Sequence, residues 1–115
     1  MPYQRGDIVE VAFLMPHNNK MENHPVVIVS NDEVYDADQC YIGIMMTTQT
    51  NEDRFTFRVT DEMLRNSNNQ KYAQARCHLI SYFLDSHIIA NSNRNKMKQN
   101  AVDKLVTYVT DSALF

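Results

Sequence analysis

The chain has 115 residues, of which 43% are apolar and 22% are charged, and its formal net charge at pH 7 is −3. This length predicts a single domain, residues 1–115, whose core needs no disulfide to fold. No apolar run reaches the length of a membrane-spanning helix, and the first residues lack a secretory signal. Because the two cysteines show no metal-ligand spacing, we expect a reduced, cytoplasmic protein without a cofactor.

Charge is distributed unevenly along the chain. Residues 1–62 contain 4 Lys or Arg and 11 Asp or Glu, whereas residues 63–115 contain 7 and 3. A partner carrying phosphates is repelled by the whole molecule at long range but could be held by the second half. The same asymmetry would serve self-association or an acidic partner peptide, so charge leaves the class of partner open.

The chain begins with two predicted strands and a long connection between them. Residues 7–13 are rich in β-forming residues, and residues 14–23 are expected to form a polar loop too long for a tight hairpin. Pro25 belongs at the start of a strand or on a sheet edge, and the apolar run at 25–30 predicts a strand buried on both faces. Residues 31–39 predict a solvated connection.

Two more strands are predicted in the middle of the chain. Residues 40–46 form the first and run into the polar segment 47–50; Gly43 within it predicts a bulge or a close backbone approach. Residues 55–59 alternate apolar with polar, which is typical of a strand with one wet face. A single helical turn is expected after Thr60.

The last part of the chain predicts strands and then one helix. After a polar loop at 66–70, residues 72–81 predict a strand, and residues 82–89 predict another beyond a bend at 84–86. A helix is expected to begin between Asn95 and Lys98 and to fray near Ser112, because apolar residues recur there at helical spacing. This order predicts a mainly β protein, a strongly bent sheet or partly open barrel capped by a C-terminal helix.

Polar residues gather at the ends of the predicted strands. None of the histidines is spaced from another His, Cys, Asp or Glu as zinc ligands are, so no metal site is expected. The candidates for a metal-free site, which converge if strands 25–30, 40–46 and 72–81 are neighbours, are His24, Thr47, Thr48, Gln49, Arg76 and His78.

Such a set suits cleavage of an RNA backbone. Histidine can take a proton from the 2′-hydroxyl or give one to the leaving 5′-oxygen, since its unperturbed pKa is about 6.5. Arginine can hold the phosphate in a fork, and threonine can donate a hydrogen bond to a non-bridging oxygen. Structural roles remain open: Thr47 and Thr48 could simply end a strand, Arg76 could form an ion pair, and His78 could be a packing residue.

Three segments carry a family resemblance. Arg5–Phe13, the strand Pro25–Asp32 and the segment Ile42–Gln49, in this order and spacing, resemble the MazF/PemK/Kid toxins of type II toxin–antitoxin systems. Arg76-Cys77 and Leu84-Asp85 fall roughly where that family has its fifth strand and a following Ile-Asp. The resemblance implies an SH3-like barrel similar to PemK and CcdB. It also implies a homodimer and a metal-independent endoribonuclease that cuts single-stranded mRNA and is inhibited by a partner antitoxin.

The resemblance also assigns residues. Thr47 matches the family threonine after the third strand, and Arg76 matches an arginine that some members have on the fifth. His24 replaces the family arginine before the strand-2 proline, and His78 replaces an aspartate of some members. A further family arginine falls near Tyr82 or Phe83, where this chain has none.

Two interpretations of these departures follow. In the first, His24 and His78 share proton transfer, Arg76 holds the phosphate and Thr47 orients its oxygens; the expected RNA contacts are His17, Lys20, Thr48 and Gln49. In the second, the chain is a non-catalytic member that poisons a protein target such as gyrase, as CcdB does, or that only binds an antitoxin.

Overall fold

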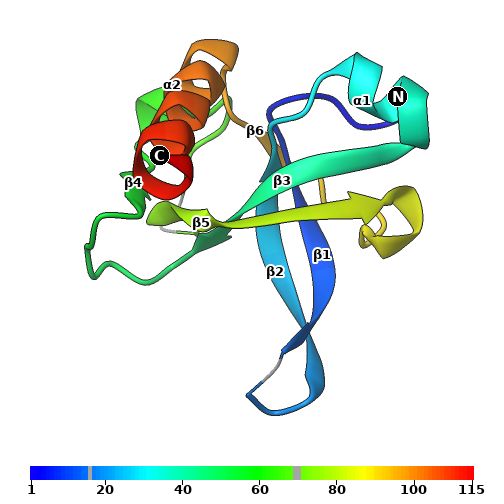
Figure 1. The fold of residues 1–115 in the computed structure, drawn as a ribbon, viewed down its shortest axis with the longest axis horizontal. Coiled ribbons are helices and arrows are strands. Elements are labelled where there is room, and N and C mark those ends of the chain that lie inside the picture. Colours follow the sequence, from blue (N-terminus) through cyan, green and yellow to red (C-terminus); the bar gives the residue numbers. More distant parts are fainter. Residues whose placement is uncertain (16, 69–70) are drawn as a thin grey trace.

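Six antiparallel strands form one curved sheet in the order β4-β5-β3-β2-β1-β6 (Figure 1). The computed structural model describes residues 1–15, 17–68 and 71–115. The strands are β1 (Asp7–Met15), β2 (Lys20–Ile28), β3 (Cys40–Thr47), β4 (Thr56–Arg58), β5 (Gln74–Leu84) and β6 (Asn95–Lys96). The helices are α1 (Asp32–Asp38) and α2 (Gln99–Val109), with 3-10 turns at Asp61–Met63 and Asp85–His87 and a π-helical turn at Thr110–Leu114.

The sheet curls until its two edges nearly meet. An isolated bridge joins Leu64, beyond β4, to Met97, beyond β6, and the Arg65 N–H donates to the Lys96 carbonyl at 2.8 Å. Strands β4 and β6 themselves are not paired with each other in the described residues, so the barrel is not closed. The predicted mainly β fold, a partly open barrel with a C-terminal helix, is therefore confirmed.

The apolar strand at 25–30 lies at the centre of this sheet. Val26, Val27 and Ile28 are all 0% exposed. Val27 packs into a core beneath α2, whereas Val26 and Ile28 face a second core on the other side of the sheet with Tyr41 and Phe83. The prediction of a strand buried on both faces is confirmed.

Pro25 lies inside β2 rather than at its start. It sits opposite Glu10 of β1, whereas pairing with β3 begins only at Val26. The Val29 N–H donates toward β3, to the Ile42 carbonyl, and N–H directions alternate along a strand. The nitrogen of Pro25 therefore faces the side where no β3 partner is paired, so the missing donor costs no ladder hydrogen bond.

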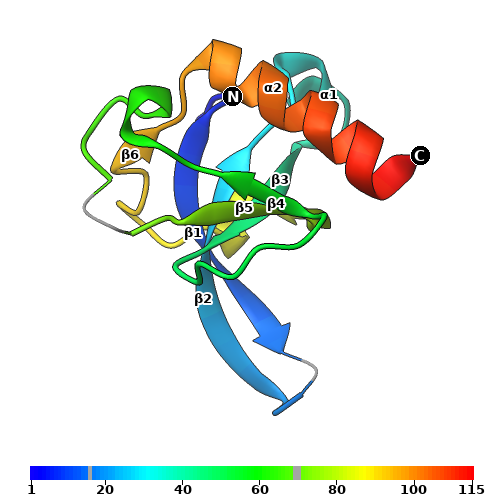
Figure 2. The same cartoon turned by 90° about the vertical axis from the view of Figure 1, so that its left-hand side faces the viewer.

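The prediction of a loop at residues 14–23 is wrong for most of this segment. β1 and β2 pair from Ile8–Val27 to Met15–Lys20, forming a long hairpin that extends away from the rest of the molecule (Figures 1 and 2). The connection is short because Asn19 adopts a left-handed φ of 57° and its N–H donates to the Met15 carbonyl at 2.9 Å. Residue 16 in this connection, like residues 69–70 of the predicted loop at 66–70, lies outside the described residues.

Two other predicted segments differ from the structure. Residues 32–38 are solvated as predicted, since none is buried, but they form the helix α1 because Asn31 caps it by accepting a hydrogen bond from the Val34 N–H. Residues 82–89 do not form a separate strand: β5 continues unbroken to Leu84 and ends in a 3-10 turn. The expected bend at 84–86 is that turn.

Gly43 marks a close approach to the backbone of β3, as predicted, by side chains of the neighbouring strands β2 and β5. A Cβ at this position would lie 2.3 Å from Val26 Cγ1 and 2.8 Å from Phe83 Cε1. The second core can therefore close over β3 only because this residue has no side chain.

The C-terminal helix covers the first core. Its buried face consists of Ala101, Val102, Leu105 and Val109, and Figure 2 shows α2 running across one side of the sheet. It begins at Gln99, just beyond the predicted range, because Met97 is buried ahead of it in an extended segment. No helix of the described residues is long and apolar enough to span a membrane.

Candidate functional site

Strand register brings several of the predicted site residues to one face of the sheet. Thr47 of β3 pairs with Gln74 of β5, and Val26 of β2 pairs with Met45. The β2–β3 pairs end at Val26 and Met45, and His24 lies two residues before this last pair on β2. Because side chains alternate between faces, Thr47 and Gln74 share a face, Arg76 follows on it two residues along β5, and His24 lies on the same face of β2 as Val26. The expected neighbourhood of these three strands is confirmed.

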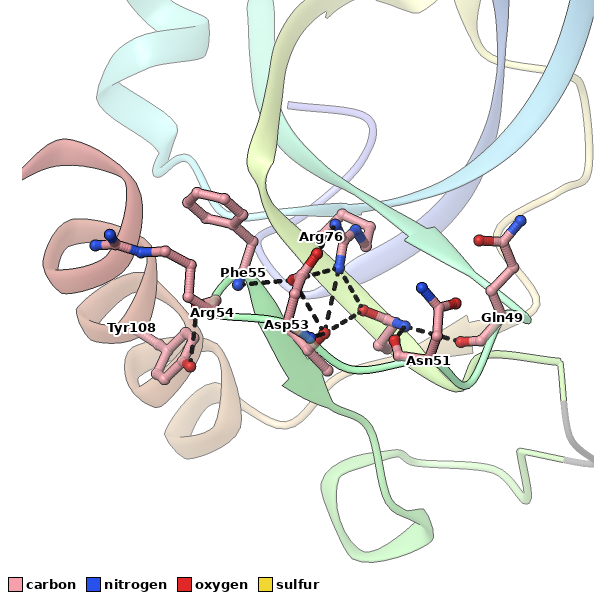
Figure 3. Close-up of polar contacts among 9 residues, drawn as sticks. Gln49, Asn51, Asp53, Arg54, Phe55, Arg76 and Tyr108 are labelled. Atoms are coloured by element: carbon pink, nitrogen blue, oxygen red, sulfur yellow. Dashed lines mark hydrogen bonds and ion pairs between the residues drawn. The ribbon is translucent and has the colours of Figure 1, made fainter.

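Arg76 is the hub of a polar network at this face (Figure 3). Its Nη1 donates to Asp53 Oδ1 at 2.9 Å and its Nη2 donates to Asp53 Oδ2 at 2.8 Å, which is a forked pair. Nη1 also lies within hydrogen-bond distance of Gln74 Oε1 at 2.9 Å and Thr56 Oγ1 at 3.2 Å. The Arg76 side chain is only 17% exposed, so this geometry fixes the guanidinium tightly.

Gln74 connects this arginine to the loop between β3 and β4. It is 2% exposed, and its Nε2 donates to the carbonyls of Gln49 at 2.9 Å and Asn51 at 2.8 Å. The Gln49 N–H in turn donates to Thr47 Oγ1 at 3.2 Å. A continuous chain of hydrogen bonds therefore joins Thr47 to Arg76 through Gln49 and Gln74, which brings three predicted site residues together.

Asp53 is strongly stabilised as a carboxylate. The hydrogen bonds from Arg76, followed by the bond from the Phe55 N–H, lower the pKa of Asp53 from 3.8 to about 2, against a smaller opposing effect of burial. The same pair raises the pKa of Arg76, mainly through its hydrogen bond to Asp53. At neutral pH the site therefore holds one cation already neutralised by one anion.

This pair predicts an acid-dependent stability. A depressed carboxylate pKa stabilises the fold fully above the unfolded value of 3.8, and the contribution is lost as pH falls through about 2. We expect the difference in urea midpoint between the wild type and Asp53→Asn to be constant from pH 7 to about pH 5 and to shrink between about pH 4 and pH 2. A difference that stays unchanged down to pH 2 would contradict the pairing.

The two histidines predicted to transfer protons lie in separate surroundings. His24 stands at the base of the hairpin, with its ring centroid 6.3 Å from that of Phe13 and its Nε2 3.4 Å from Glu22 Oε1. That Nε2 is buried and makes no hydrogen bond in the described structure. His78 is exposed and its ring lies against Phe55, with centroids 4.4 Å apart. No contact joins either histidine to Arg76 within the part of the chain described.

The predicted RNA contacts divide between two segments. His17 and Lys20 lie exposed at the end of the hairpin, with His17 Nε2 3.9 Å from Glu22 Oε2. Thr48 and Gln49 are exposed in the loop that connects β3 to β4.

Sequence reasoning missed the residues that hold Arg76. Asp53 lies in a polar loop with no recognisable motif, and only the structure shows its contact with β5. Gln74 had a weak signal, since a glutamine flanked by Ala73 and Ala75 in a predicted strand is a candidate for burial with satisfied hydrogen bonds. Among residues 1–15, 17–68 and 71–115, no three His, Cys, Asp or Glu side chains cluster as metal ligands do.

Comparison with solved structures finds the same fold. An endoribonuclease in complex with its cognate antitoxin, from a mycobacterial species, gives a TM-score of 0.69 at 12% identity and covers 96% of this chain and 93% of its own. MazE–MazF (Form-III) from Deinococcus radiodurans gives a TM-score of 0.65 at 9% identity, covering 95% and 94%. MazF (Form-I) from the same organism gives 0.62 at 10% identity, again covering 95% and 94%.

Sequence comparison gives the family. No curated protein sequence matches the chain significantly. Residues 4–106 match the family model for the PemK-like, MazF-like toxin of type II toxin-antitoxin systems, which accounts for all six strands and most of α2. The resemblance inferred from three segments is thus confirmed: the chain belongs to the PemK/MazF toxin family.

Proposed function

We propose that the chain is a toxin that cleaves single-stranded RNA without a metal ion. The observation that carries this proposal is the forked, partly buried guanidinium of Arg76, joined to the Thr47 hydroxyl through Gln74 and Gln49 on a fold whose solved relatives include an endoribonuclease. Such a group can neutralise charge on a phosphate, and a hydroxyl on the same face can bond a non-bridging oxygen.

The proposed reaction needs a general base, a general acid and groups that stabilise negative charge on the phosphoryl oxygens. The 2′-oxygen attacks phosphorus and loses its proton to His24, while the bond to the 5′-oxygen breaks and that oxygen takes a proton from His78. The products are a 2′,3′-cyclic phosphate and a 5′-hydroxyl. Arg76 and the Thr47 hydroxyl stabilise the charge that develops on the phosphoryl oxygens.

His17, Lys20, Thr48 and Gln49 are proposed to contact the RNA. They occupy the hairpin end and the β3–β4 loop, at the two ends of the face that holds His24 and Thr47. Recognition of single-stranded RNA through loop side chains is common because unstacked bases expose their edges.

An antitoxin and a second copy of the chain are the proposed partners. Two of the similar structures hold a toxin together with its antitoxin. A second copy is supported by an apolar face beside the end of α2, which encloses a cavity of about 160 Å³ and whose exposed members include Ile42, Ile80, Val106 and Leu114. An apolar surface of this kind is typical of a protein interface.

The test is incubation of the 115-residue protein in EDTA with a long single-stranded RNA. We expect cleavage fragments that end in a 2′,3′-cyclic phosphate, because the 2′-hydroxyl is the nucleophile. The matched control is the same RNA with a single 2′-deoxy nucleotide at a mapped cleavage position, which should stay intact at that position only. Cleavage that requires added Mg²⁺, or that proceeds at the deoxy position, would contradict the mechanism. No cleavage at all would favour a protein target or simple antitoxin binding.

A further inference from the structure

The loop at residues 49–53, called the strap below, binds the guanidinium of Arg76, the arginine on which the proposed function depends. Asp53 uses both carboxylate oxygens on Nη1 and Nη2 of Arg76. Nη1 also lies within hydrogen-bond distance of Gln74 Oε1 and Thr56 Oγ1. An incoming phosphate therefore meets an arginine whose forked face is already bound.

A phosphodiester and a carboxylate are close equivalents for this fork. Each carries one negative charge at neutral pH, and each offers two equivalent oxygens to a pair of parallel N–H groups. Replacing one by the other conserves the charge and the number of hydrogen bonds at Arg76. The two anions must then compete for the same N–H groups.

A second pair involves the same strap. Glu52 forms an ion pair with Arg58 of β4, through the arginine Nε. Arg58 pairs across the sheet with Gln74, and Thr56 pairs with Arg76, so the two arginines lie on one face of adjacent strands. Two successive acidic residues of one loop thus cover two neighbouring arginines of the sheet.

The strap is fixed to the sheet by its backbone as well. Gln74 Nε2 donates to the carbonyls of Gln49 and Asn51, whereas the Phe55 N–H donates to the Asp53 side chain at Oδ1. The Asp53 side chain is 45% exposed, whereas that of Arg76 is 17% exposed. The carboxylate therefore lies on the solvent side of the pair. To turn outward it must give up its bonds from Arg76 and from the Phe55 N–H, while Gln74 keeps the strap backbone in place.

We propose that Asp53 is an internal competitor for the RNA phosphate: it occupies Arg76 in the free protein and must leave the guanidinium when RNA binds. This inference rests on the proposed function, because it assigns a regulator to the same arginine. The strap then lowers the affinity for RNA in general and favours strands that supply extra contacts to displace the carboxylate.

The test measures binding separately from cleavage. A fluorescent single-stranded oligonucleotide carrying 2′-O-methyl groups throughout has no nucleophile, so its dissociation constant is read by anisotropy without turnover. We expect Asp53→Asn to bind it about fivefold more tightly than the wild type, the factor that corresponds to losing one partly exposed ion pair. The matched control is Asp36→Asn on α1, which removes the same charge from an exposed position away from Arg76 and should change the affinity much less.

A double-mutant cycle links the effect to Arg76. In an Arg76→Gln background, Asp53→Asn should change the affinity no more than Asp36→Asn does, because the guanidinium for which the carboxylate and the phosphate compete is absent. Thermal unfolding of each variant checks folding, and Asp53→Ala provides a second variant that also removes the competing oxygens.

The outcomes separate this inference from the proposed function. Weaker binding by both Asp53 variants would make Asp53 a positioning residue for Arg76 and would overturn the competition. A wild type that cuts RNA, with Asp53 variants of unchanged affinity, would overturn the competition alone. Failure of the wild type to cut or bind RNA would overturn the proposed function and this inference with it.

Discussion

Replacing His24 with alanine is expected to lower the turnover rate of RNA cleavage by about 10²- to 10⁴-fold, the usual contribution of a general acid or base. His24 lies two residues before the Val26–Met45 pair on β2, whereas His78 lies beside Phe55, and the His24 Nε2 makes no hydrogen bond in the described structure. That nitrogen is buried beside Glu22, so a role in proton transfer requires that RNA binding expose it to the 2′-hydroxyl. The measurement is kcat and KM on a short RNA that contains one mapped cleavage position.

The matched control for this variant is His17→Ala. His17 lies on the same hairpin but its side chain is 65% exposed, and its proposed role is to contact RNA. We expect His17→Ala to raise KM and to leave kcat nearly unchanged. Equal kcat values for the wild type and His24→Ala, with unchanged thermal unfolding, would show that His24 takes no part in proton transfer.

Replacing Arg76 with alanine is expected to lower kcat by about 10²- to 10³-fold, the range measured when one group that stabilises transition-state charge is removed. Arg76→Lys should recover little of this loss, because an ammonium cannot reproduce the fork. The variant also leaves Asp53 and Gln74 without a shared partner, so its thermal unfolding is measured beside its kinetics.

Arg58→Ala provides the comparison for Arg76. Both arginines lie on the same face and each is paired with an acid of the strap, but the Arg58 side chain is 62% exposed whereas that of Arg76 is 17% exposed. We expect Arg58→Ala to raise KM and to lower kcat by much less than Arg76→Ala. Equal losses in both variants would mean that the arginines contribute only general attraction for RNA.

The strands could be predicted from sequence because their signals are local. The run at Val26–Val29, the alternation at 55–59 and the helical spacing after Met97 each reflect burial of one or two faces. The hairpin arm could not be predicted in this way. Its residues at 14–15 and 20–23 are mostly polar or exposed, and they are strands only because each pairs with the other.

The helix α1 shows a different limit. Its cap, Asn31, and its acidic first turn are visible in the sequence, but Asn31-Asp32 is equally suited to a turn. None of its residues is fully buried, so the segment lacks the strong apolar periodicity that identifies a helix.

The candidate site could be predicted only in part, because some of its contacts join residues that are far apart in the sequence. Thr47, Gln49 and Arg76 were found from strand ends and from the family resemblance. The Asp53–Arg76 pair joins residues 23 positions apart in the sequence and depends on how the β3–β4 loop folds back. Residue types alone left Arg76 with many possible acidic partners, and only the register of β4 and β5 selects this one.

The hairpin arm has a consequence for how the molecule can open. Beyond Pro25 the arm is a ribbon of two strands, whereas β2 is held on both sides from Val26 onward. A two-stranded ribbon is marginally stable in water. Backbone amides at 12–15 and 20–23 should therefore exchange with solvent deuterium through local fraying, and those of 26–28 only through global unfolding. Pro25 thus separates the body of the sheet from an arm that can open locally while both cores stay intact.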